Sequence, residues 1–237
     1  EGDDRRLMLW DLVTANAPRR IPTTLVAFSP SPSPDGNEVA FAGVEKGAGP
    51  AGNVDLFITT RDGNTRRVAP SAGFDGDPAW SPDGTKLAFT SSRASGALDI
   101  HVIELASGTI QQLTNVGAGG TMPGSGNAAR APTWSPDGMR IAYTMQVGGA
   151  SQLWVMSASG TGKLQLTNAA DANDYEPAWS PDGSVIAFAR LFRGAQPAMV
   201  MTVEPDGRNV TNIGNRGVFV TATPAYSPDG RWLTTAQ

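Results

Sequence analysis

The sequence predicts an all-β protein, a β-propeller of five four-stranded blades in which N- and C-terminal strands together close the last blade. Three observations predict this fold. The tetrapeptide SPDG occurs five times, alternating apolar residues follow each copy, and the two chain ends complement each other. Each blade of a propeller is one four-stranded sheet, so a repeat of about 40–50 residues is its expected signature.

The SPDG copies begin at regular intervals and stand in a repeated context. Their spacings are 48, 54, 45 and 47 residues, with starts at Ser33, Ser81, Ser135, Ser180 and Ser227. In four of them proline and an aromatic residue precede the turn, as in PAWSPDG. A type I turn favours proline second and glycine fourth, so we interpret SPDG as a hairpin turn. The first copy, in AFSPSPSPDG (27–36), reads as an irregular one with four inserted residues and no strand-start proline.

Segments with period-2 alternation follow each turn and predict the remaining strands. The predicted second strands are EVAFAG (38–43), KLAFTS (86–91), RIAYTM (140–145), VIAFAR (185–190) and RWLTTA (231–236). The predicted third strands are DLFIT (55–59), DIHVI (99–103), QLWVM (152–156) and AMVMT (198–202). Fourth strands follow a short glycine-containing turn, as in QQLT (111–114) and LQLT (164–167).

The chain ends predict how the ring closes. RLMLWDLVTANAPRRI (6–21) aligns with a third and fourth strand, and PAYSPDGRWLTTAQ (224–237) with a first and second. Joining them as one blade would remove exposed sheet edges. We therefore expect a single domain, 1–237, with blades at approximately 25–70, 77–115, 131–168 and 176–213, and a composite blade of 223–237 plus 4–22.

Composition argues against several function classes. The chain has 18 basic and 22 acidic residues, and a net charge of −4 does not favour nucleic acid as a partner. Cysteine is absent, and no apolar run is long enough to predict a membrane span. Three arginine pairs, Arg5–Arg6, Arg19–Arg20 and Arg66–Arg67, are either solvated strand edges or contacts for an acidic protein.

The residues indicate no catalytic, cofactor or metal site. A serine nucleophile needs a base, and the one histidine, His101, aligns with the apolar residues Phe57, Trp154, Val200 and Met8 of other repeats. GTMPGSGNA (120–128) departs from the nucleophile-elbow pattern. Carboxylates gather before two first strands, in FDGDP and DANDYEP. They are either Asx turns at strand entry or a cation or sugar site at the propeller axis.

The repeat PAWSPDG…IAF…DI.V…G…LT resembles the TolB-type propeller repeat, a WD-repeat-like family, over nearly the whole chain. The resemblance implies a periplasmic or otherwise extracytoplasmic location and protein partners, among them a membrane complex. We therefore expect a non-enzymatic protein-interaction module, an extrinsic subunit or scaffold of a cell-envelope complex. Two alternatives stay open: a small-ligand, carbohydrate or cation-binding propeller, and a regulatory propeller separated from a prolyl oligopeptidase-like hydrolase.

Loop content predicts which face binds. The SPDG turns and the third-to-fourth turns are short and share one face, whereas the connections on the other face vary in length and content. Binding residues usually lie on variable loops of a rigid scaffold. We therefore expect partner-binding residues on this variable face, namely Phe74, Asp75, Asp77, Arg130, Tyr175, Glu176, Phe192, Arg193, Arg216 and Phe219.

Overall fold

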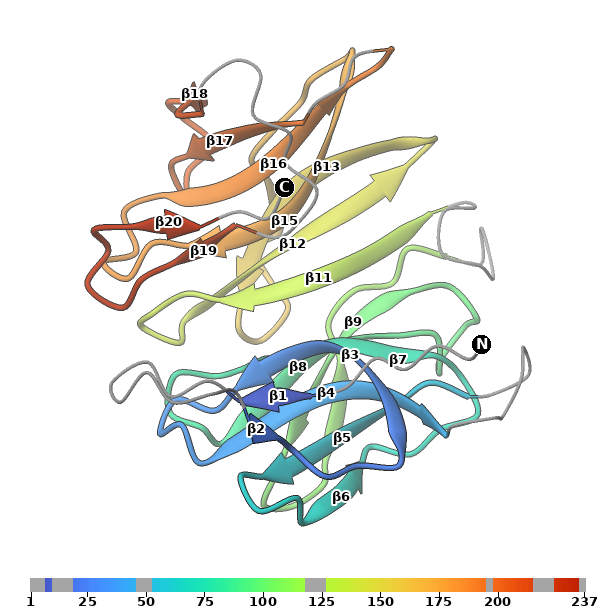
Figure 1. Ribbon diagram of the computed structural model, residues 1–237. Coiled ribbons are helices and arrows are strands. Elements are labelled where there is room, and N and C mark those ends of the chain that lie inside the picture. The colour runs from blue at the N-terminus through green and yellow to red at the C-terminus, as the bar shows by residue number, and fades with distance from the viewer. Residues whose placement is uncertain are drawn as a thin grey trace.

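The computed structural model describes residues 7–9, 19–45, 53–117, 127–194, 198–214 and 224–234, and the regular elements in these ranges are all β-strands (Figure 1). They form four four-stranded antiparallel sheets and two two-stranded sheets. In each four-stranded sheet the strands follow one another in chain order, which is the topology of a propeller blade. The predicted all-β propeller class is confirmed.

The four complete blades coincide with four of the SPDG repeats. Blade 1 contains β3 (Leu25–Pro32), β4 (Glu38–Glu45), β5 (Asp55–Thr60) and β6 (Thr65–Val68). Blade 2 contains β7 (Asp75–Trp80), β8 (Lys86–Ser91), β9 (Asp99–Glu104) and β10 (Ile110–Gln112). Blade 3 contains β11 (Ala128–Trp134), β12 (Arg140–Val147), β13 (Ala150–Ser157) and β14 (Leu164–Gln165). Blade 4 contains β15 (Ala172–Trp179), β16 (Ile186–Phe192), β17 (Met199–Val203) and β18 (Thr211–Asn212).

Each SPDG tetrapeptide is the hairpin between a first and a second strand. In blade 3 the amide of Gly138 donates to the carbonyl of Ser135 at 2.9 Å, and the Ser135 hydroxyl donates to Asp137 Oδ1 at 2.5 Å. The amide of Arg140 in turn donates to Ser135 Oγ at 2.9 Å. The serine hydroxyl and the Met139 amide lower the pKa of Asp137, because both donate to its carboxylate. The serine and the aspartate are therefore committed to the turn.

A β-bulge interrupts the first strand of each of the four complete blades, just before its proline. In β7 the pairing with β8 shifts between Gly76 and Ala79, and Asp77 takes a left-handed φ of 50°. The same shift and a positive φ recur at Ala131 and Glu176 in blades 3 and 4. A left-handed conformation is rare for residues with a side chain, so its recurrence at equivalent positions marks a conserved element of blade geometry within this chain.

Blade 1 is more regular than its sequence suggests. The register of β3 with β4 shifts between Phe28 and Ser31, and Ser29 has a φ of 46°. Pro30 thus stands where Pro78 stands in blade 2, three residues before its SPDG turn. The expectation that blade 1 lacks the strand-start proline is wrong. Its bulge contains Ser29 and Pro30, just as the bulge of blade 2 contains Asp77 and Pro78, so the first strand has no extra residues.

Neighbouring blades pack face to face and are joined by a repeated hydrogen bond. The blade 2–blade 3 core includes Ile100 on one side and Trp134 and Tyr143 on the other, all buried. The indole Nε1 of Trp134 donates to the carbonyl of Ala79 in the preceding first strand at 3.2 Å. Trp80 and Trp179 make the equivalent bonds to the carbonyls of Ser31 and Thr133. The aromatic residue before each of these SPDG turns therefore ties its blade to the one before it.

The two short sheets stand where the halves of a fifth blade are expected. The sheet of β1 (Met8–Leu9) and β2 (Arg19–Arg20) packs Leu7 and Ile21 against Phe41 of blade 1. The amide of Ile21 donates to the carbonyl of Leu7 at 3.0 Å, as the amide of Leu113 does to the carbonyl of Ile100 in blade 2 at 2.8 Å. β1 and β2 therefore have the geometry of a third and a fourth strand.

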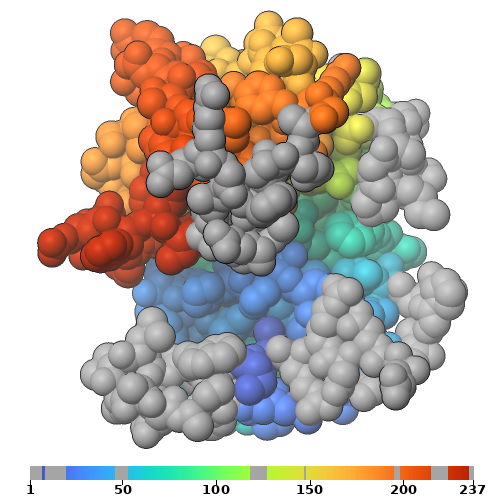
Figure 2. Space-filling view, turned by 45° about the horizontal axis from the view of Figure 1, so that its top comes forward, coloured from blue at the N-terminus to red at the C-terminus, as the bar shows by residue number. Residues whose placement is uncertain are grey.

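The C-terminal sheet of β19 (Ala225–Tyr226) and β20 (Leu233–Thr234) packs against blade 4, whereas the N-terminal sheet packs against blade 1. Leu233 packs against Val200 of blade 4. Figure 1 shows β19 and β20 beside β15 of blade 4, and in Figure 2 the red C-terminal atoms border the blue atoms of blade 1. Within the described ranges no strand pairing joins β20 to β1. Closure of a five-bladed ring therefore stays a prediction.

Candidate functional site

The first strands of the blades surround one central cavity of about 540 Å³, which we call the axial cavity. The left-handed residue of each bulge lines it, together with the proline that follows. These four bulge residues are Ser29, Asp77, Ala131 and Glu176. The cavity volume lies in the usual range of ligand sites, and two of the four residues are acidic.

Asp77 is held in place by side chains of two blades. Its carboxylate accepts a hydrogen bond from the Thr90 hydroxyl at 2.9 Å and a longer one from the Ser29 hydroxyl at 3.4 Å. Thr90 Oγ1 also accepts from the amide of Ala131 at 3.2 Å. One threonine thus connects the bulges of blades 2 and 3. Glu176 is exposed, so the two acidic groups of the cavity have different surroundings.

Arg130, the third residue of β11, is an arginine with unused donors. Its Nε and Nη2 atoms are buried, and neither finds a hydrogen-bond acceptor in the described part of the chain. Thr144 lies directly opposite in β12, and its buried hydroxyl likewise has no partner there. Buried donors without acceptors are costly, typically about 1–3 kcal/mol each. A guanidinium in this state is suited to an incoming carboxylate.

Two acidic residues near the first strands are structural. Asp75 is fully buried, and its Oδ2 atom accepts from Arg93 Nη2 and from the Ser71 hydroxyl, both at 2.9 Å. In blade 4, buried Asp174 accepts a bidentate pair of hydrogen bonds from Arg190, Nε to Oδ1 at 2.7 Å and Nη2 to Oδ2 at 2.8 Å. A buried carboxylate needs such a counter-ion. The expectation that Asp75 contacts a partner directly is therefore corrected.

The other predicted partner-binding residues are distributed over several blades. Phe74, Tyr175 and Phe192 are half-buried, and Arg193 is exposed. Arg216 and Phe219 lie outside the described residues. The structure brings together Asp77 and Glu176 at the axial cavity. Sequence reasoning missed Ser29 there, although the spacing from Pro30 to its SPDG turn was the signal that could have found it.

His101 occupies a packing position. Its side chain is buried, its ring lies 5.7 Å from that of Phe89, and Nδ1 is 3.2 Å from the carbonyl of Asp99. Burial lowers the pKa of the imidazole and favours its neutral form. Strand pairing shows that its counterpart in blade 4 is Met201, not Val200 as the sequence alignment suggested. Among the described residues no group of three or more potential metal-ligating side chains was found.

The repeated four-stranded sheets, interblade tryptophans and axial cavity define the molecule as a β-propeller. A model of the TolB beta propeller domain matches residues 2–128 and 121–237, and the chain belongs to this family. No helix in the described part of the chain is long and apolar enough to cross a membrane.

Individual relatives cover the chain to different extents. It is 34% identical over 118 residues to the Tol-Pal system protein TolB of Anaeromyxobacter dehalogenans (strain 2CP-C), which is 49% of this chain and 25% of that protein. TolB from Acinetobacter baumannii superimposes with a TM-score of 0.76 at 20% identity, over 98% of this chain and 54% of that one. An oligogalacturonate lyase in complex with manganese superimposes with a TM-score of 0.67 at 15% identity, over 95% of this chain and 62% of that one. At these identities the two solved structures support the fold alone.

Proposed function

We propose that this propeller is a non-enzymatic protein-interaction module, an extracytoplasmic subunit or scaffold of a Tol-Pal-type envelope assembly. Membership of the TolB propeller family and the Tol-Pal name of its 34% identical relative support this reading. The net charge of −4 supports a protein rather than a nucleic acid as the partner.

The observation that carries the proposal is a difference between the two faces. On the SPDG face, the aspartate of every turn accepts from its own serine at 2.5–2.6 Å, so these carboxylates have local partners. Toward the other face, Arg130 keeps buried donors with no acceptor among the described residues. The planar fork of a guanidinium matches a carboxylate, so a partner carboxylate that displaced the side chains covering Arg130 would satisfy these donors.

An interaction test follows from this difference. The tagged chain is used to isolate complexes from solubilised membranes of the source organism, and stoichiometric partners are identified by mass spectrometry. We expect Arg130→Gln and Tyr175→Ala to lose the stoichiometric partner, whereas Asp83→Ala and Asp137→Ala on the SPDG face retain it. Loss in the SPDG-face variants with retention in the others, all folded by circular dichroism, would refute the proposed binding face.

The axial cavity supports a second candidate, a binder of a cation or carbohydrate. Asp77 and Glu176 both line this cavity, and carboxylates are suitable partners for divalent cations and sugar hydroxyls. Selective binding to the native state raises thermal stability. Stabilisation by calcium, manganese or oligogalacturonate that disappears in Asp77→Asn would favour this candidate. Unchanged melting with all three would remove it.

A further inference from the structure

Two of the arginine pairs noted in the sequence each contribute one residue, Arg20 and Arg67, to a groove at the rim of the propeller. Strand pairing places Arg20 opposite Met8 and Arg67 opposite Phe57. The same position in blades 2, 3 and 4 holds neutral side chains, namely Gln112, Gln165 and Asn212. Arg20 and Arg67 are thus structural equivalents in two neighbouring sheets, and among the described sheets only these two carry a cationic side chain at this position.

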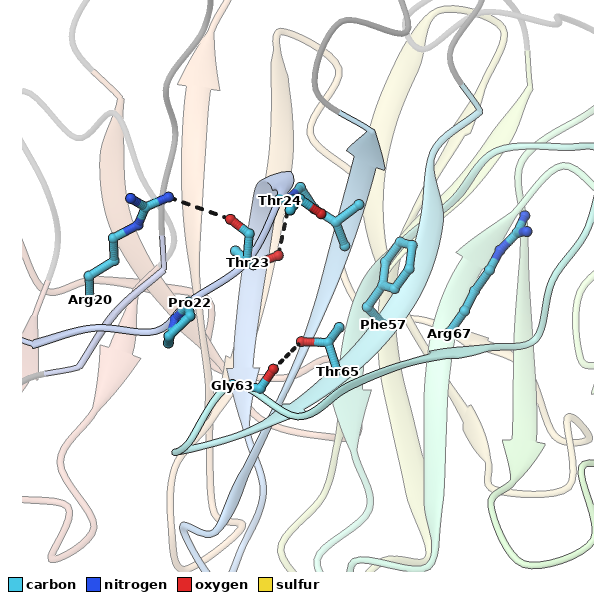
Figure 3. Close-up of a pocket in the computed structure, with 9 residues that line it drawn as sticks. Arg20, Pro22, Thr23, Thr24, Phe57, Gly63, Thr65 and Arg67 are labelled. Carbon is cyan, nitrogen blue, oxygen red and sulfur yellow. Dashed lines mark hydrogen bonds between the residues drawn. The ribbon is translucent and has the colours of Figure 1, made fainter.

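A groove of about 770 Å³ lies between these two arginines, and we call it the peripheral groove. Figure 3 shows Arg20 and Arg67 at its opposite ends, with the ring of Phe57 and the side chains of Thr23 and Thr65 between them. None of the described residues that line the groove is acidic. Its lining therefore has a guanidinium at both ends and is partly apolar in between.

The groove is preorganised. The Phe57 ring stacks on buried Phe41, with centroids 5.6 Å apart, so it forms a firm apolar floor. Arg67 is anchored through Nη2 to the carboxylate of buried Asp55, while its side chain remains 44% exposed. Fixing these groups before binding lowers the entropic cost of association.

Arg20 is the less committed of the two cations. It is exposed, and among the described residues its side chain makes one hydrogen bond, a 3.4 Å contact from Nη2 to the carbonyl of Thr23. Each guanidinium has five N–H donors in a planar fork that suits a carboxylate. Both arginines thus keep donors for an incoming anion.

We propose that the peripheral groove binds an acidic segment of a partner protein, with carboxylates at Arg20 and Arg67 and a bulky apolar side chain on Phe57. The apolar floor favours such a segment over a small inorganic anion, which would leave Phe57 uncovered. The overall negative charge of the chain disfavours a polyanionic surface. This groove is separate from the axial cavity and from Arg130, so its test is independent of the proposed function.

The test uses the whole chain and a fluorescein-labelled peptide in which glutamate alternates with leucine, with a glutamine–leucine peptide as the uncharged match. Fluorescence anisotropy measures binding at low and at physiological salt. We expect the glutamate peptide to bind more tightly, and Arg20→Gln to weaken it about tenfold or more, since charge-assisted bonds have that magnitude. Arg208→Gln, an equal charge change at a 75% exposed site on blade 4, should leave binding unchanged.

Arg67→Gln also tests the second cation, with circular dichroism to check folding because the substitution leaves Asp55 without its counter-ion. Equal binding of the two peptides, or wild-type affinity in Arg20→Gln, would overturn the proposal. An equal loss in Arg208→Gln would also overturn it, as a general charge effect. Arg20-dependent binding to phosphatidylglycerol vesicles without binding of the peptide would replace the protein partner by a lipid surface.

Discussion

Removing the indole of Trp134 should strongly destabilise the propeller. Trp134 is 8% exposed, packs in the core between blades 2 and 3, and donates to the carbonyl of Ala79 at 3.2 Å. Replacing a buried tryptophan by alanine typically costs about 3–5 kcal/mol. At about 2–4 °C per kcal/mol for a chain of this size, Trp134→Ala should lower Tm by roughly 6–20 °C.

Urea unfolding followed by far-ultraviolet circular dichroism, together with calorimetry, measures this loss. Trp232→Ala is the matched control, because Trp232 is 71% exposed and should change the free energy of unfolding by no more than about 0.5 kcal/mol. Trp134→Phe keeps much of the packing and loses the indole hydrogen bond, so its cost should be smaller. Equal destabilisation by Trp134→Ala and Trp232→Ala would refute the reasoning that interblade burial is the cause.

Three further predictions concern charges and backbone. Arg190→Met should lower the free energy of unfolding by about 3–5 kcal/mol, because it leaves the carboxylate of Asp174 buried without its counter-ion. Urea unfolding should show a smaller loss for the double variant Asp174→Leu/Arg190→Met, in which no charge is left buried. Ala131→Gly should leave the free energy of unfolding unchanged or raise it by up to about 1 kcal/mol, because Ala131 has a left-handed φ of 51° that glycine adopts without strain. Ala142→Gly in buried β12 should lower it, and equal effects of the two substitutions in urea unfolding would refute backbone strain at Ala131. Hydrogen bonds from Ser180 and Ser184 lower the pKa of Asp182 from 3.8 to about 2. The contribution of Asp182 to folding stability is therefore present above about pH 4 and lost as the pH falls through about 2. If Asp182→Asn lost as much stability on acidification as the wild type, this assignment would be contradicted.

The blades could be predicted from sequence because their signals are local and repeated. The SPDG turn depends on proline, glycine and a serine–aspartate contact within four residues, and the strands on a period of two. The same local patterns gave a wrong prediction at Pro30. Blade 1 has Pro32 where the other repeats have an aromatic residue, so the alignment of its first strand was missed. These patterns also failed to separate Asp75 from Asp77. Asp77 is itself the left-handed residue of the bulge, where the alternation breaks, so Asp75 is buried beside Arg93 while Asp77 lines the axial cavity.

The sequence by itself determined the all-β propeller class, the order of strands within each repeat and the structural role of SPDG, because each follows from residues close together in the chain. Only the tertiary structure decided which polar side chains are paired and which keep free donors. Arg130 lacks an acceptor within the described chain, and Arg20 and Arg67 line opposite ends of one groove, because the neighbours of each side chain come from other strands. Burial and pairing depend on those neighbours, which local sequence patterns do not specify.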